Sequence, residues 1–169
     1  MLKTVAVAGL SLFFLTAPVL AQPKGGQQAP QATPDWRAQP RYATVDLRAG
    51  FEPDPREIQV EAGGDREVQG LGPDCGGWID FSKPDVDLNY TAGSYPLFIS
   101  VVAQTDTTLV MNDAAGNWIC NDDLDGLNPG ILIQNPRSGN YNIWIGTFER
   151  GAPQRATLRI SEIPPTTRR

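Results

Sequence analysis

The chain has 169 residues, with 14 Lys or Arg, 19 Asp or Glu, two cysteines and no histidine. That length suits one domain once a targeting segment is removed. Because histidine is the side chain that ordinarily titrates near neutrality, its absence excludes Ser-His-Asp triads, Cys-His dyads and H-E-x-x-H zinc sites.

Residues 1–21 have the pattern of a secretory signal peptide. Lys3 supplies a basic start, an apolar run covers residues 5–15, and small residues lead to a cleavage point after Ala21. Thr16 and Pro18 interrupt the run, whereas a membrane anchor needs about 20 apolar residues. We therefore expect an exported protein, periplasmic or secreted, with no membrane anchor after cleavage.

The mature chain is expected to begin and end with unstructured segments. Residues 22–41 are rich in Gln, Ala and Pro and have only Trp36 as a large apolar side chain. Such a segment buries too little surface to offset its ordering entropy. We predict a disordered linker over 22–41, a folded domain over 42–163 and a disordered tail over 164–169.

Within the domain, apolar residues recur with a period of two, which indicates strands with one buried face. Gly-, Asn- and Asp-rich turn signals separate the runs, and no segment has a helical stripe. This pattern predicts an all-β fold, a jelly-roll-like two-sheet β-sandwich. The expected core includes Val86, Leu88, Leu97, Ile99, Leu109, Ile143, Ile145, Leu158 and Ile160. The expected strands are 42–47, 56–61, 66–71, 76–81, 86–91, 96–104, 107–112, 117–121, 130–135, 140–148 and 155–161.

The two cysteines predict one structural disulfide. Cys75 and Cys120 are the only cysteines of a chain expected in an oxidising compartment. A redox-active or metal-binding thiol pair is the alternative, but the sequence has no C-x-x-C spacing.

The net negative charge of the domain excludes some classes of partner, and its run of aspartates makes a cation a candidate ligand. Residues 42–163 carry 18 acidic side chains against Lys83 and seven arginines, a net charge of −10. Nucleic acids and anionic membranes, which demand clustered Lys and Arg, are therefore not expected as partners. From Pro84 to Pro136 there is no Lys or Arg, but there are seven Asp.

Two acidic loops flank a Trp-containing strand in residues 106–129. Converging carboxylate and amide oxygens would suit Ca²⁺. Asn121, Asp123 and Asp125 have the spacing of the first half of an EF-hand loop, but Leu132 stands where that loop needs Glu. An EF-hand is rejected and a general oxygen-ligand Ca²⁺ site is retained. In the alternative interpretation these side chains serve turns by bonding their own backbone.

Tryptophan provides a second candidate site. Trp118 and Trp144 are candidate platforms for sugar rings. The alternation of residues 140–147 places Trp144 on the face opposite Tyr141, Ile143 and Ile145, either in solvent or under a covering loop. The alternative for both side chains is ordinary packing.

Several segments carry a family resemblance. They are Asp-Thr-Thr-Leu at 106–109, Gly-Asn-Trp-Ile-Cys at 116–120, Asp-Asp at 122–123, Asn-Pro at 128–129, Ser-Gly-Asn-Tyr at 138–141 and Ile-Trp-Ile-Gly-Thr at 143–147. Together they resemble the bacterial pre-peptidase C-terminal domain. Gly-Phe-Glu-Pro-Asp-Pro at 50–55 and Ala-Gly-Gly at 62–64 are similar to the leading half of short exported proteins that carry this domain.

This resemblance covers about residues 42–162 and implies a jelly-roll β-sandwich, usually appended to secreted peptidases. There the domain is implicated in secretion, targeting or substrate binding. Some members bind Ca²⁺ through acidic loop residues, which would fall here on Asp113, Asn117, Asp122, Asp123 and Asp125. No peptidase domain is recognisable in these residues, so we expect the module either to act on another molecule or to persist in the cell envelope without such a role.

The sequence therefore favours a non-enzymatic exported binding or accessory module, with Ca²⁺ as a candidate stabilising ion. Its expected partner is an extracytoplasmic protein or a polysaccharide. The alternatives are a carbohydrate-binding module that uses tryptophan and, third, a hydrolase that uses carboxylate chemistry.

Overall fold

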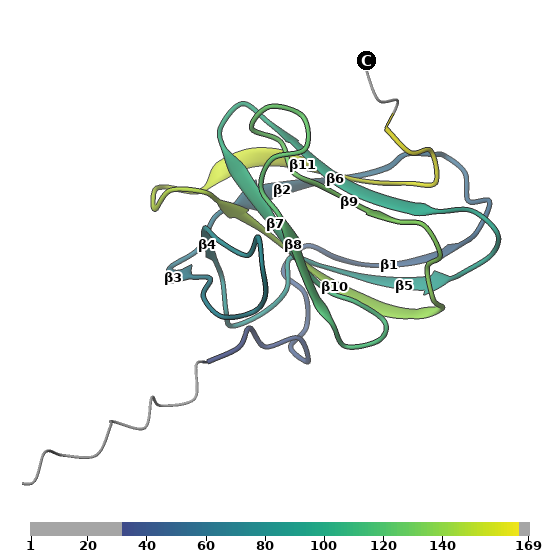
Figure 1. The fold of residues 1–169 in the computed structure, drawn as a ribbon, viewed down its shortest axis with the longest axis horizontal. Helices are drawn as coiled ribbons and strands as arrows, with labels where there is room; N and C mark the ends of the chain where they lie inside the picture. The colour runs from purple at the N-terminus through teal and green to yellow at the C-terminus, as the bar shows by residue number, and fades with distance from the viewer. Residues whose placement is uncertain (1–31, 166–169) are drawn as a thin grey trace, which may run out of the picture. The chain divides into compact units, whose positions relative to one another are not determined.

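The computed structural model describes residues 32–165, which form an all-β fold of eleven strands in two sheets (Figure 1). Within these residues, no helix is long and apolar enough to cross a membrane. The predicted signal peptide, residues 22–31 of the predicted linker and residues 166–169 of the tail lie outside the described part of the chain.

Seven strands form sheet A. Its order is β1 (Ala43–Arg48), β5 (Val86–Thr91), β10 (Gly139–Thr147), β4 (Trp78–Ile79) and β3 (Arg66–Glu67). β10 also pairs with β7 (Thr107–Asn112), which in turn pairs with β8 (Trp118–Asn121). β1 runs parallel to β5, and the other pairs are antiparallel.

Four antiparallel strands form sheet B. Its order is β2 (Arg56–Ala62), β11 (Gln154–Ser161), β6 (Leu97–Ala103) and β9 (Gly130–Ile133). Because both sheets join strands that are distant in sequence, folding depends on long-range pairing. The eleven predicted strands are confirmed, although β3 and β4 have only two residues each.

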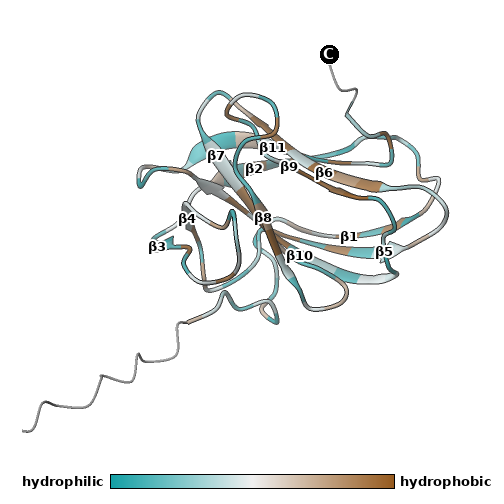
Figure 2. Cartoon of the chain, viewed as in Figure 1, coloured by the Kyte–Doolittle hydropathy of each residue, from teal (hydrophilic) through white to brown (hydrophobic). Residues whose placement is uncertain are grey.

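The main core lies between the sheets. Val86, Leu88 and Tyr90 of β5 are buried there, while Asp87 and Asn89 face outward, as the period of two requires. All nine predicted core residues have 0% exposure. Figure 2 shows the hydrophobic positions concentrated on the strands, with hydrophilic loops at their ends.

A second apolar cluster lies on the outer face of sheet A. Val68 and Ile79, from the segment 63–83, pack with Val110 of β7 and Trp144 of β10. We call residues 63–83 the covering segment. The predicted disulfide is present and ties Cys75 of this segment to Cys120 of β8, with their Cα atoms 4.9 Å apart.

The folded domain begins earlier than the predicted residue 42. Pro34 is buried. The amide of Asp35 donates to the carbonyl of Phe81 at 2.8 Å. The amide of Arg41 donates to the carbonyl of Pro84, also at 2.8 Å. The predicted disordered linker therefore extends too far, because residues 34–41 pack along the end of the covering segment.

Candidate functional site

The first predicted acidic loop is a self-contained turn. Oδ1 of Asp113 accepts hydrogen bonds from the amides of Ala115 and Asn117, both at 2.8 Å, and its Oδ2 accepts one from Nδ2 of Asn117 at 3.1 Å. Both carboxylate oxygens of Asp113 are thus engaged within the turn. This is the alternative that the sequence left open for Asp113 and Asn117.

The second loop begins at the other end of β8. The four residues of β8 separate Asn117 from Asp122, so the two loops lie about 13 Å or more apart along the strand. Oδ1 of Asn121 accepts the amide of Gly130 at 2.8 Å. The expectation that the two loops converge on one ion is therefore wrong. In residues 32–165, no group of three or more Asp, Glu, His or Cys side chains is arranged to hold a metal.

The carboxyl group of Asp106 interacts electrostatically with the carboxylates of the second loop. Burial raises the pKa of its carboxyl group, and the neighbouring charges of Asp123, Asp122 and Glu149 raise it further. Its Oδ1 is buried without a hydrogen-bond partner among the described residues. Asp123 and Asp125 are exposed. Asp106 therefore lies among the negative charges of Asp122, Asp123 and Glu149, whereas the carboxylate of Asp113 is engaged by its own turn.

The two candidate tryptophans pack against each other. Their ring centroids are 5.4 Å apart, and Trp144 has 0% exposure beneath the covering segment. The predicted alternation of Trp144 is confirmed, but a fully buried ring cannot stack on a sugar. The prediction of Trp144 as a ligand-binding residue is therefore wrong. Trp118 is half-buried against it.

A cleft of about 670 Å³ opens beside the covering segment. Its walls come from Arg41, from residues 63–66, from residues 80–82 and from Pro153. A close crossing shapes it, since a methyl group at Gly64 would lie 1.8 Å from the carbonyl carbon of Ile79. Only glycine allows the two parts of the covering segment to approach so closely.

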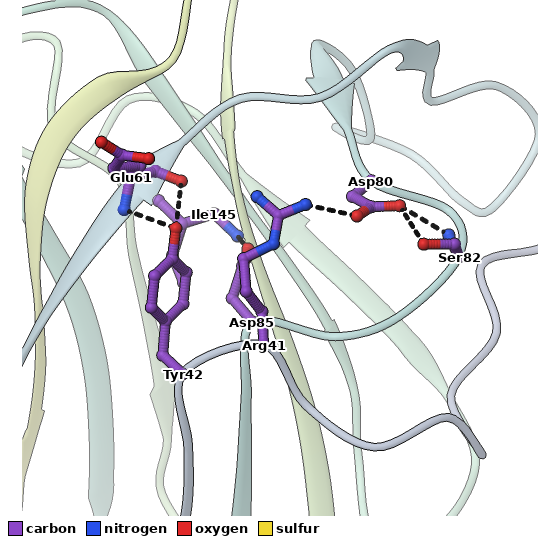
Figure 3. Close-up of polar contacts among 7 residues, drawn as sticks. All are labelled: Arg41, Tyr42, Glu61, Asp80, Ser82, Asp85 and Ile145. Carbon is purple, nitrogen blue, oxygen red and sulfur yellow. Dashed lines mark hydrogen bonds and ion pairs between the residues drawn. The ribbon is translucent and has the colours of Figure 1, made fainter.

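Charged side chains of both signs line this cleft. The guanidinium of Arg41 forms an ion pair with Asp80, whose Oδ1 also accepts the amide and the hydroxyl of Ser82 at 2.8 and 2.6 Å (Figure 3). Burial alone would raise the pKa of Asp80, but these hydrogen bonds and the charge of Arg41 outweigh it and lower the pKa. Arg66 stands over the ring of Phe81 at 4.9 Å. The cleft thus presents fixed charges beside an aromatic surface.

Asp85 lies behind the cleft and is 2% exposed. Its Oδ2 accepts the amide of Ile145 at 2.8 Å (Figure 3). The ladder between β5 and β10 ends at Val86 and Ile143, so this carboxyl group replaces the next backbone partner of β10. Burial raises the pKa of Asp85 to about 7, although the Ile145 amide and the charge of Arg41 act in the opposite direction.

Sequence reasoning missed Arg41, Asp80 and Asp85. Arg41 fell in the predicted linker and Asp80 in a predicted strand. Asp85 follows Pro84 and immediately precedes the alternating run of β5. That position, an acid at the start of a buried strand, is the one signal that could have identified it.

Asp80 in the wall of the cleft and Asp85 behind it have different environments, but they do not form a recognisable acid and base pair. Asp80 has a lowered pKa and is bound to Arg41, while Asp85, whose pKa is near 7, does not line the cleft. A general acid must reach the substrate within hydrogen-bond distance. Asp85 therefore could not act as a general acid on a ligand held in the cleft as the structure shows it.

The chain matches no protein-family model and no curated protein. The likeness to the pre-peptidase C-terminal domain stays a prediction.

Proposed function

We propose that this protein is a non-catalytic extracytoplasmic module that binds a polar segment of a partner protein in the cleft between Arg41, Arg66 and Asp80. The observation that carries the proposal is the cleft itself, which combines both signs of charge with the ring of Phe81. Convergent polar groups in a concave site fix the orientation of a bound ligand.

The scaffold around the cleft supports this proposal. The covering segment is tied to β8 by the disulfide and to β10 through Trp78 and Thr147. Side chains held on such a frame lose little entropy when a ligand binds. The disulfide also fits an oxidising compartment outside the cytoplasm. We extend this to export, periplasmic or secreted, through the predicted signal peptide.

Site-specific photocrosslinking tests the proposal in cells that produce the protein. A photoreactive residue in place of Arg66 should give a discrete protein adduct. The matched control is the same residue in place of Arg137, an exposed arginine in the loop before β10 that does not line the cleft. The proposal fails if position 66 gives no adduct, or if both positions give the same adducts.

A second candidate function is carbohydrate binding, and a row of polar side chains favours it. Nδ2 of Asn89 donates to Asp46 at 2.9 Å, and Nδ2 of Asn140 donates to Asn89 at 3.0 Å. The row crosses β1, β5 and β10 and lines a hollow of about 510 Å³. Its amides are oriented in advance and retain free donors and acceptors for hydroxyl groups.

Retention on insoluble polysaccharides tests this second candidate. Binding should fall in Asn89→Ala and persist in Trp144→Phe, because Trp144 is buried. Absence of retention at high protein concentration would eliminate the candidate.

We keep Ca²⁺ in the proposal as a stabilising ion near Asp106. The buried, unpartnered Oδ1 of Asp106 beside Asp122 and Asp123 supports this placement. A bound cation would relieve the repulsion among these carboxylates.

A further inference from the structure

The outer face of sheet B carries exposed aliphatic side chains on adjoining strands. Val102 of β6 is 48% exposed, Leu132 of β9 is 38% exposed, and Leu124, in the loop before β9, is 49% exposed. Phe98 of β6 is the register partner of Leu132. Phe98 is itself only 9% exposed, and we call its ring together with the exposed Val102, Leu124 and Leu132 the aliphatic face.

Glycine at position 130 allows Leu124 to join this face. A Cβ atom at Gly130 would lie 2.5 Å from Cδ2 of Leu124 and 2.9 Å from the ring of Phe98. Leu124 therefore lies across β9 beside the ring of Phe98. Leu132 is next to the same ring, because it is paired with Phe98 in the neighbouring strand. Val102 extends the face along β6, because residues 98, 100 and 102 point to the same side.

The loop that carries Leu124 is fixed to β6 by two hydrogen bonds. The amide of Val101 donates to the carbonyl of Pro129 at 3.0 Å, and the amide of Ala103 donates to Oδ1 of Asn128 at 2.8 Å. Leu124 is thus presented by a loop whose backbone is held in place against the sheet.

The rim of the aliphatic face is acidic. Asp122, Asp123 and Asp125 belong to the same loop as Leu124, and residues 84–136 contain no Lys or Arg. Arg159 lies opposite Ser100 on this side of the sheet, but it forms an ion pair with Glu57 at 3.1 Å. Arg155, on the same side of β11, is exposed. The end of the face formed by the loop before β9 therefore offers apolar contact together with negative charge, while the arginines lie on β11.

We infer that the aliphatic face docks a segment of a partner protein in which aliphatic side chains alternate with Lys or Arg. Exposed apolar patches rimmed by polar groups are typical of interaction sites. The acidic rim would attract cationic side chains and repel an anionic lipid surface. A symmetric pairing of two copies would bring two identical acidic rims together. This surface is separate from the cleft, so the inference does not depend on the cleft as a binding site. A Ca²⁺ ion beside Asp122 and Asp123 would neutralise part of the rim, and the test is therefore done in EDTA.

Binding of labelled model peptides tests this inference on the oxidised protein. The probe is a peptide of about eight residues, the length of a strand, that alternates Leu and Lys. Matched peptides alternate Leu with Glu and Ser with Lys. Fluorescence anisotropy should show binding of the Leu–Lys peptide alone, and raising the salt concentration should weaken it because the attraction to Asp123 and Asp125 is screened.

Two variants separate the apolar and the charged contributions. Leu124→Ser with Leu132→Ser should weaken binding about tenfold or more, because two apolar contacts are lost. Asp123→Lys with Asp125→Lys should weaken binding and remove its salt dependence. Ile163→Ser is the control, because Ile163 is 64% exposed but lies in the segment after β11, outside the aliphatic face.

Three results would overturn the inference. The first is equal binding of the Leu–Glu peptide. The second is binding that the serine variant leaves unchanged while its melting temperature shows that it is folded. The third is a dimer of the native protein, detected by sedimentation, that the serine substitutions dissociate. The aliphatic face would then be occupied by a second copy of this chain.

Discussion

Replacing Asp85 by Asn tests the role of the buried carboxyl group behind the cleft. Burial raises the pKa of Asp85 from 3.8 to about 7. One step in pKa corresponds to about 1.4 kcal/mol, so ionising this group in the folded protein costs roughly 4 kcal/mol more than in the unfolded chain. The amide oxygen of the substituted side chain would still accept the amide of Ile145, but the side chain would never ionise.

The sign of the effect follows from proton binding. Below about pH 4, Asp85 is protonated in both the folded and the unfolded protein, so its ionisation contributes nothing to the free energy of unfolding. Between about pH 4 and 7 the folded state holds the proton more strongly, and stability falls as pH rises. Above about pH 7 the carboxyl group is ionised in both states, and the full cost of roughly 4 kcal/mol remains.

Chemical denaturation of both proteins at several pH values measures this difference. Relative to the native protein, Asp85→Asn should gain roughly 4 kcal/mol between about pH 4 and 8, or about 15 °C in melting temperature. Asp46→Asn, the same change at an exposed position of β1, should show no comparable gain. A stability difference between native protein and Asp85→Asn that stays constant with pH would refute the reasoning.

Three further predictions concern the core, the disulfide and the acidic loop. Ile143→Ala should lower the free energy of unfolding by about 2 to 5 kcal/mol in denaturant titrations, because Ile143 is fully buried; an unchanged midpoint would contradict its place in the core. Cys75→Ser with Cys120→Ser should cost about 4 kcal/mol in the same assay, because the unfolded chain regains the entropy of a 45-residue loop; no loss would mean that the bond does not restrain the unfolded chain. Ca²⁺ added after EDTA should raise the melting temperature to saturation, unlike Mg²⁺, and Asp123→Asn should abolish the rise. No shift would mean that the acidic loop is a solvated turn.

The sandwich could be predicted because its strands bury one face each. The alternation of Tyr141, Ile143 and Ile145 needed only the period of two, and the same reasoning placed Trp144 on the opposite side. The sequence of β10 does not indicate which residues cover that side. The cover comes from residues more than 60 positions earlier in the chain, so the sequence left the environment of Trp144 open.

The candidate site was less predictable because it depends on which strand ends meet. The acidic loops at 113–117 and 122–125 are adjacent in sequence, yet β8 carries them to opposite ends of one strand. Composition likewise suggested disorder around Arg41, although its backbone is hydrogen-bonded to Pro84 and its side chain to Asp80. Low apolar content limits the burial of a segment in a core of its own. It does not prevent the segment from packing on a core that already exists.

The disulfide connects the expected compartment to the proposed function. β3 and β4 have two residues each, so few strand-to-strand hydrogen bonds hold the covering segment in place. The segment nevertheless supplies most of the walls of the cleft. Its anchors are the apolar cluster around Trp144 and the bond between Cys75 and Cys120. Reduction would remove one of these anchors. A binding site built in this way suits a protein that works where disulfides persist.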